Sequence, residues 1–246
     1  VYMEKDRVWT PSNYDKKFRG KVLARRAFAS SLNVVSVQIY EMTGGGRIAK
    51  FASRLTGSPL SGFTLDPTLS LGSSSMTLWE MVKGYGVIAR EGKSIDPHVI
   101  IRITDGSGKI VDEYATPGEK RVISRPVALL IGDLLQDVVN RGTAAGAVRQ
   151  NAGLTIQAAG KTGTTSNFRD AWFVGFTPDL VAGVWMGCDD PIFTLGENKT
   201  GSVCAAPVWA RFMKETEHRN GKFSSISGAD GIVRREICSH SGLLPG

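Results

Sequence analysis

Apolar residues recur at helical spacing in three parts of the chain, which predicts three helical regions. The first covers residues 20–55, and the glycines at positions 44–46 are expected to end it. The second is an apolar stripe over residues 78–89 that should stop by Gly92. The third follows Pro126, where apolar residues again share one side of the predicted helix.

Two helix starts can be placed from the residue types around them. Thr77 and Glu80 are spaced as a capping box, in which the hydroxyl and the carboxylate each satisfy a first-turn amide. Pro207 stands at a plausible first helical position, ahead of an apolar stripe that includes Trp209 and Phe212. This last helix is expected to cover a sheet.

Strand-like segments occupy the middle of the chain. Residues 99–104 and 110–114 are rich in β-branched types and flank the turn sequence DGSG at residues 105–108, which predicts a hairpin. Three further short strands are expected at residues 161–167, 171–176 and 180–186.

The predicted elements run in the order helices, hairpin, helix, antiparallel strands, helix. This order is typical of an α+β fold, with an antiparallel sheet flanked by helices next to a helical lobe. We expect residues 1–215 to form this domain and residues 216–246, rich in glycine and serine, to form a C-terminal tail or the start of a following segment. Because the chain opens with Val1 and not Met, we expect an N-terminally truncated piece of a longer protein.

The composition argues against several classes of function. The net charge of +7 comes from scattered lysines and arginines, without the basic stripe and interleaved aromatics typical of nucleic-acid binding. No apolar run approaches the roughly 18 residues that a membrane span needs. The three cysteines and three histidines lack metal-ligand spacing, so neither a metal nor another cofactor is expected. Whether Cys188 and Cys204 could form a bridge is left open.

The sequence KTGTT at residues 161–165 is the strongest candidate for a functional site. A phosphate-binding loop is not supported, because position 155, where that motif needs glycine, is Thr155. The alternative is an exposed strand at the rim of an active site. There Lys161 would supply positive charge, the threonine hydroxyls would bind a carboxylate, and Gly163 would let a substrate backbone come close. A peptide could add to such an edge strand, with the N–H of Thr164 facing an oxyanion.

The triplet Ser31-Leu32-Asn33 is a second, weaker signal. Serine and asparagine both favour helix caps, so capping is the simplest interpretation of the triplet taken alone.

The two motifs, in this order, resemble two of the three signature elements of serine β-lactamases and penicillin-binding proteins. Other segments resemble the transpeptidase domain of class A, bifunctional penicillin-binding proteins, and the similarity runs nearly continuously from about Trp9 to about Phe212. These segments are WTPSNYD at residues 9–15, LGSSSMTLWEM at 71–81, VVNRGTA at 138–144 and DAWFVGFTPD at 170–179. The resemblance implies the fold shared by serine β-lactamases and these transpeptidases.

The resemblance also implies a role for each motif residue. Ser31 resembles the serine that shuttles a proton toward the leaving amine, and Asn33 the residue that hydrogen-bonds a catalytic lysine and the substrate's peptide carbonyl. Lys161 resembles the lysine that tunes the electrostatics of this proton path. Thr162 and Thr164 resemble the hydroxyls that hold the terminal carboxylate of a D-Ala-D-Ala stem peptide or of a β-lactam.

The first signature element, Ser-x-x-Lys, does not occur in the 246 residues. In the family it supplies the nucleophilic serine and precedes the Ser-x-Asn triplet, so we expect it upstream of Val1 and expect this piece alone to be inactive. The resemblance implies a membrane-anchored parent at the outer, periplasmic face of the bacterial cytoplasmic membrane, with a glycosyltransferase domain. Its expected partners are peptidoglycan stem peptides and β-lactams, and no nucleic acid.

Two other functions remain open. A catalytically dead relative would bind wall peptides or protein partners, although a pure scaffold needs none of Ser31, Asn33 and Lys161. A D,D-carboxypeptidase or β-lactamase-type hydrolase would use water in place of the acceptor amine, and no residue distinguishes it from a transpeptidase.

Overall fold

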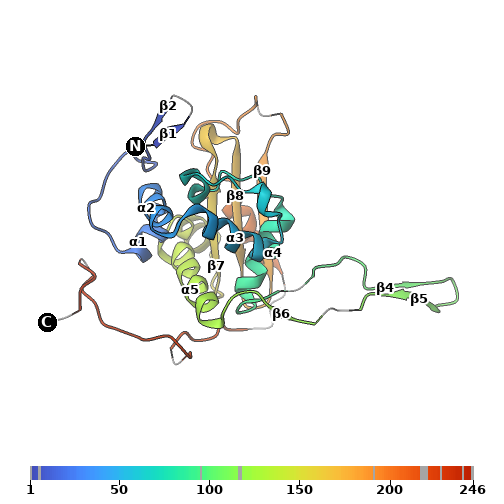
Figure 1. Cartoon of the computed structure of the whole chain (residues 1–246). Helices are drawn as coiled ribbons and strands as arrows, with labels where there is room; N and C mark the ends of the chain where they lie inside the picture. Colours follow the sequence, from blue (N-terminus) through green and yellow to red (C-terminus); the bar gives the residue numbers. More distant parts are fainter. Residues whose placement is uncertain are drawn as a thin grey trace.

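The computed structural model describes residues 2–4, 7–94, 96–115, 118–190, 192–216, 221–227, 229–239 and 241–244. Its centre is a three-stranded antiparallel sheet in the order β7-β8-β9 (Figure 1). The strands are β7 (Ala159–Thr164), β8 (Asp170–Phe176) and β9 (Val181–Gly187). Lys161 pairs with Val174 and Gly163 with Trp172, so the KTG segment lies on a strand that ends the described sheet.

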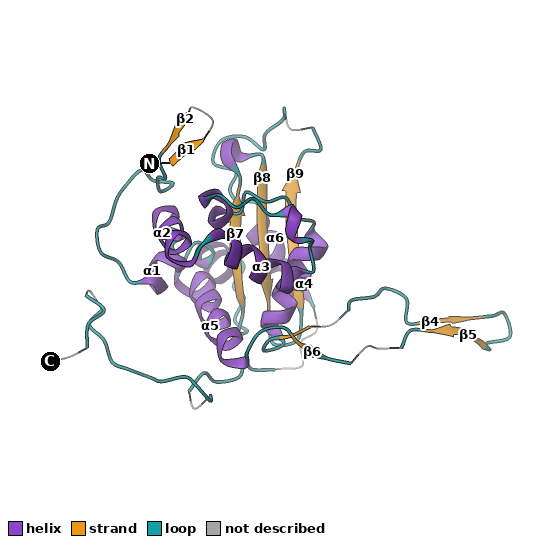
Figure 2. Ribbon diagram, viewed as in Figure 1, coloured by secondary structure: helices purple, strands orange, loops and turns teal. Residues whose placement is uncertain are grey.

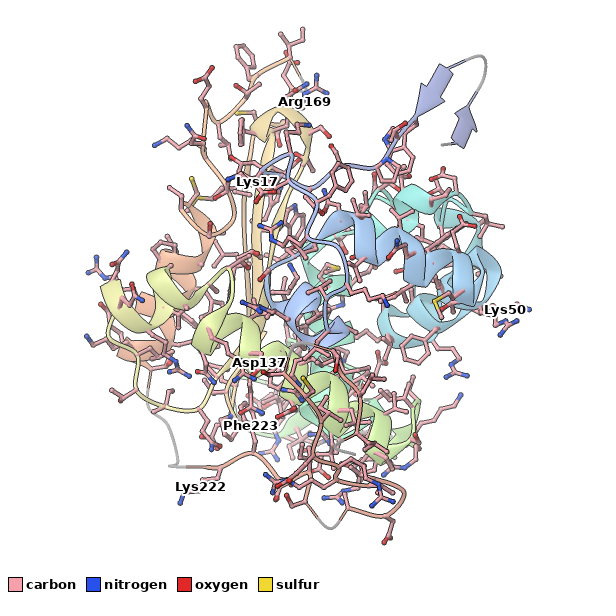
Figure 3. All side chains as sticks on the ribbon, turned by 90° about the vertical axis from the view of Figure 1, so that its left-hand side faces the viewer. Lys17, Lys50, Asp137, Arg169, Lys222 and Phe223 are labelled. Carbon is pink, nitrogen blue, oxygen red and sulfur yellow. The ribbon has the colours of Figure 1, made fainter. Side chains whose placement is uncertain are left out.

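In the residues that the structure describes, six α-helices pack around this sheet. They are α1 (Ala24–Ala29), α2 (Asn33–Thr43), α3 (Gly45–Thr56), α4 (Leu78–Ala89), α5 (Arg125–Arg141) and α6 (Ala205–Glu215). Figure 3 views the sheet along its edge, with α6 on one side and α2, α3 and α4 on the other. Helices on both faces explain why successive residues of β8, Phe173 and Val174, are both buried.

The main hydrophobic core lies between the sheet and α6. Phe173 of β8 and Trp209 of α6 are fully buried, with ring centroids 4.9 Å apart. The indole N–H of Trp209 donates to the carbonyl oxygen of Ala182 over 3.1 Å, which satisfies its one polar group. The last helix therefore covers the sheet as the sequence predicted.

The described part of the chain also forms three small two-stranded sheets outside the central one. They are β1 (Tyr2–Glu4) with β2 (Arg7–Trp9), β3 (Lys93–Ser94) with β6 (Lys120–Arg121), and β4 (Arg102–Thr104) with β5 (Ile110–Glu113). The β4–β5 hairpin was predicted, and it projects away from the body of the molecule (Figure 2). All residues of its two strands are exposed.

The α+β prediction is confirmed, and several element boundaries are corrected. The capping box is present, with Thr77 and Glu80 bonded reciprocally at the start of α4. Gly44 ends α2, but positions 45 and 46 begin the next helix instead of continuing the break.

Pro207 is the third residue of α6 and not the first. A proline is tolerated there, because the N–H groups of the first helical turn have no partner within the helix. The predicted 161–167 strand starts two residues earlier and stops at Thr164, before Asn167 adopts a positive φ of 61°.

The described residues that follow α6 contain no helix or strand. One of them, Phe223, packs edge-on against Phe176, with ring centroids 5.5 Å apart (Figure 3). Among the helices that the structure describes, none is long and apolar enough to cross a membrane. The division at residues 215 and 216 stays a prediction.

Candidate active site

Ser31 stands in a tight turn between two helices. Its φ is 53°, in the left-handed region that non-glycine residues seldom occupy. The turn is held by backbone hydrogen bonds from Ser31 N to Phe28 O (3.1 Å) and from Leu32 N to Ala27 O (2.9 Å). The surrounding hydrogen bonds thus hold Ser31 in a backbone conformation that costs free energy for a residue with a side chain.

The helix-cap interpretation of the triplet is wrong. The N-cap of α2 is Leu32, and neither the Ser31 nor the Asn33 side chain makes a capping hydrogen bond. The serine side chain is instead directed at a distant part of the chain.

Lys161 meets Ser31 across 130 residues of sequence. The ammonium Nζ donates to the Ser31 hydroxyl oxygen over 2.8 Å and to the carbonyl oxygen of Thr162 over 3.0 Å. Burial of the ammonium lowers the pKa of Lys161 to about 8. At neutral pH the group therefore still carries its charge, but it exchanges its proton far more readily than an exposed lysine does.

Asn33 lies at the first position of α2 and contacts a different segment. Its amide Nδ2 donates to the carbonyl oxygen of Ser12 over 3.1 Å, and Asn13 Oδ1 accepts from Val34 N over 3.2 Å. Asn13 is buried, and its own amide donates to Lys17 O over 2.7 Å. The segment around Asn13 thus supports the start of α2, a role that its resemblance to family sequences did not reveal.

Thr143 is a site residue that the sequence analysis missed. Its hydroxyl lies 2.8 Å from the Thr162 hydroxyl, and its backbone N–H donates to Ala29 O over 3.1 Å. The preceding Gly142 approaches so closely that a Cβ there would lie 2.3 Å from the same Ala29 oxygen. Thr143 therefore joins the strand of Lys161 to the helix that leads to Ser31. It falls within the VVNRGTA segment, whose only signal was family resemblance.

The hydroxyls of Thr162 and Thr164, the two threonines of the KTGT strand, both make hydrogen bonds within the chain. Thr162 pairs with Thr143, and the Thr164 hydroxyl oxygen accepts from Gly201 N over 3.0 Å. Each hydroxyl can still hold another partner, because a hydroxyl has one donor and two acceptor positions. Gly201 packs so tightly on this strand that a Cβ there would lie 2.4 Å from Gly163 O.

Ion pairs hold the first helix in place. Arg25 of α1 pairs with Asp133 and, at 2.7 Å, with Asp137, both on α5. Arg141 shares the Asp137 carboxylate over 2.5 Å (Asp137 is labelled in Figure 3). Because Asp137 is buried, this cluster fixes how α1 lies on α5 more firmly than an exposed pair would. The Ser31 turn follows directly from α1.

The site joins the partly desolvated ammonium of Lys161 to the hydroxyl of Ser31, and the hydroxyls of Thr162 and Thr164 lie on the same strand as Lys161. Such a set can move a proton and bind a carboxylate. In the described part of the chain, no three His, Cys, Asp or Glu side chains gather as metal ligands, and Cys188 and Cys204 are not joined in a disulfide. Two hollows described in the same residues lie beside α5, and neither is lined by Ser31 or Lys161, so a shared groove over the motifs stays a prediction.

This fold and this pair of motifs define a class of protein. Residues 1–214 match the family model of the penicillin binding protein transpeptidase domain. The chain belongs to this family, as the resemblance implied.

Individual relatives agree with the family. The chain is 35% identical over 206 residues to penicillin-binding protein 1A of Aquifex aeolicus, a match that covers 84% of the chain and 27% of that protein. It is 35% identical over 211 residues to penicillin-binding protein 1A of Neisseria gonorrhoeae, covering 84% and 26%. The chain therefore spans about a quarter of the length of these relatives.

Solved structures share the fold. The crystal structure of penicillin-binding protein 1A from Haemophilus influenzae matches with a TM-score of 0.88 at 26% identity, covering all of this chain and 41% of that one. The imipenem acyl-enzyme complex of penicillin-binding protein A from M. tuberculosis matches with a TM-score of 0.66 at 20% identity, covering 82% and 50%.

Proposed function

We propose that this chain is the C-terminal part of a serine D,D-transpeptidase that cross-links D-Ala-D-Ala stem peptides of peptidoglycan. The observation that carries the proposal is the 2.8 Å hydrogen bond from Lys161 Nζ to the Ser31 hydroxyl. It joins the two motifs by which the family's catalytic residues are recognised, and it gives the Ser31 oxygen a cationic neighbour with a lowered pKa.

The nucleophile would come from a Ser-x-x-Lys segment outside these 246 residues. Its hydroxyl oxygen bonds to the carbonyl carbon of the penultimate D-Ala, and the C–N bond to the terminal D-Ala breaks. The hydroxyl proton passes through Ser31 to the leaving amine. The nitrogen of an amine on a neighbouring stem then bonds to the acyl carbon, the ester C–O bond to the serine breaks, and the amine proton returns to the serine oxygen.

Lys161 and the two threonines are assigned to the substrate. The leaving D-Ala carries the terminal carboxylate, which the Thr162 and Thr164 hydroxyls would hold beside the Lys161 charge. Gly163 has no side chain between them, so an extended peptide could lie along β7, the end strand of the described sheet. The N–H of Thr164 would face the oxyanion, and Asn33 the substrate's peptide carbonyl.

The same site would accept β-lactams, since the imipenem complex of the M. tuberculosis protein is an acyl-enzyme and shares this fold. The resemblance to penicillin-binding protein 1A favours a parent in the cell envelope, anchored at the periplasmic face of the membrane and carrying a glycosyltransferase domain.

The test is product analysis with a longer form of the chain that extends upstream through a Ser-x-x-Lys segment. A stem peptide ending in D-Ala-D-Ala is supplied with and without an acceptor amine. Release of D-Ala together with the cross-linked peptide is the expected result. Release of D-Ala with only the hydrolysed peptide, even at saturating amine, would indicate a carboxypeptidase. No release of D-Ala would indicate a catalytically dead binding protein.

A further inference from the structure

A polar hollow lies beside the C-terminal half of α5 and before β7. Its volume is about 510 Å³, within the size range of small-molecule sites. Amide, hydroxyl and guanidinium groups line it, with Leu154 as the apolar contribution and no carboxylate. The lining residues are Gln136, Asn140, Arg149, Gly153, Leu154, Thr155 and Gln157.

Arg149 is held rigidly in this hollow. Its Nη1 donates to the carbonyl oxygens of Leu154 (2.5 Å) and Ile156 (2.7 Å), and its Nε donates to Asn140 Oδ1 over 2.9 Å. These bonds engage the Nε and Nη1 groups of the guanidinium and fix its plane. A fork that is already oriented loses little conformational entropy when it binds a ligand.

The positive charge of Arg149 has no counter-ion in the part of the chain that the structure describes. Among the described residues, no acidic side chain forms an ion pair with Arg149. The Nη2 group likewise makes no hydrogen bond to a described residue. Burial lowers the pKa of the Arg149 guanidinium, because its charge is partly desolvated.

From this geometry we propose that the hollow is a binding site for a carboxylate, with Arg149 Nη2 donating to the bound oxygens. The side chains of Asn140, Thr155 and Gln136 supply further polar contacts for the rest of the ligand. A half-buried, oriented guanidinium without a counter-ion gains charge-assisted hydrogen bonds when a carboxylate enters. The site does not include Ser31 or Lys161, so the proposal is independent of the proposed acyl transfer.

The test is a titration of the 246-residue chain with glutarate, at constant ionic strength, monitored by the NMR signals of the Arg149 side-chain Nε–Hε and the Asn140 side-chain amide. Saturable shifts with a Kd on the order of 1–10 mM are expected for one oriented ion pair. Neutral glutaramide, of the same length, is the ligand control and should leave both signals in place.

The decisive variant is Asn140→Asp. The substitution keeps the shape of the side chain that accepts from Arg149 Nε, so the fold should persist, and it supplies the missing counter-ion inside the protein. Glutarate affinity is expected to fall at least about tenfold. Gln38→Glu on the exposed side of α2 makes the same change in net charge elsewhere and should alter affinity less than about twofold.

Three results would overturn the proposal. They are a glutarate affinity of Asn140→Asp equal to that of the parent chain, binding of glutaramide as tight as that of glutarate, and no saturable shift up to about 50 mM glutarate.

Discussion

Lys161 is the residue whose chemistry is most changed by its surroundings. Burial of its ammonium lowers its pKa to about 8, against about 10.4 for an unperturbed lysine. We expect the NMR signal of its side-chain carbon Cε to titrate with a midpoint near pH 8. A midpoint above pH 10 for Lys161 would contradict the desolvated environment.

The same shift predicts how stability depends on pH. Between about pH 8 and 10.4 the folded chain has released the Lys161 proton, while the unfolded chain still holds it. The contribution of Lys161 to the free energy of unfolding therefore rises with pH in this range. Lys161→Met removes the titration. The difference in unfolding free energy between the parent chain and Lys161→Met should therefore shift in favour of the parent across this window, as followed by urea denaturation. A difference that stays constant from pH 7 to 10.5 would count against the shift.

Thr143 is predicted to act through its hydroxyl. Thr143→Val keeps the shape and the backbone bond to Ala29 but removes the 2.8 Å contact with the Thr162 hydroxyl. We expect a loss of about 1 kcal/mol in unfolding free energy, measured by urea denaturation. Thr143→Ser keeps a hydroxyl and should recover most of that loss. If the serine variant is as unstable as the valine variant, the methyl group and not the hydroxyl is what matters.

At the scale of elements, the loop that leads into α6 fixes the KTGT strand. A Cβ at position 201 would lie 2.3 Å from Trp172 O and 2.4 Å from Gly163 O, so Gly201→Ala must push the loop and strand apart. We expect this substitution to lower the unfolding free energy by about 1–3 kcal/mol. Gly46→Ala in α3, where a Cβ meets nothing within 4 Å, is the matched control and should be neutral or slightly stabilising. Equal stability of the two variants would show that the loop does not press on β7.

The sequence predicted elements better than it predicted their contacts. The helices, the β4–β5 hairpin and the central strands follow from apolar periodicity and turn residues, which are local properties of the chain. The capping box at Thr77 was predictable because both partners lie within one turn. The start of α6 was misplaced because proline is tolerated anywhere in a first helical turn.

The candidate site was predictable only where a motif marks it. Ser31 and Lys161 were found through two short motifs, although 130 residues separate them and no periodicity links them. Thr143 and Gly201 escaped detection because each acts through a tertiary contact, one through a shared hydroxyl and one through the absence of a side chain. Such contacts exist only after folding, so single-residue patterns do not reveal them.

At the scale of the whole molecule, the helices and the sheet bring Ser31 and Lys161 together. Helix α1 is held on α5 by the ion pairs of Arg25, and Thr143, just after α5, reaches the strand of Lys161. The chain thus brings the residues of its two motifs together, and it spans about a quarter of the length of the curated relatives it resembles. The proposed acyl transfer therefore depends on the proposed upstream nucleophile.

The most direct measurement of that dependence is covalent labelling with a fluorescent penicillin. The 246-residue chain should remain unlabelled, and a form extended upstream through a Ser-x-x-Lys segment should be labelled. In the extended form, Lys161→Ala should slow labelling at least about 100-fold, while Lys50→Ala, on the outer side of α3 (Figure 3), should leave the rate unchanged. Labelling of the 246-residue chain, or an extended form in which Lys161→Ala is labelled as fast as its parent, would contradict the account.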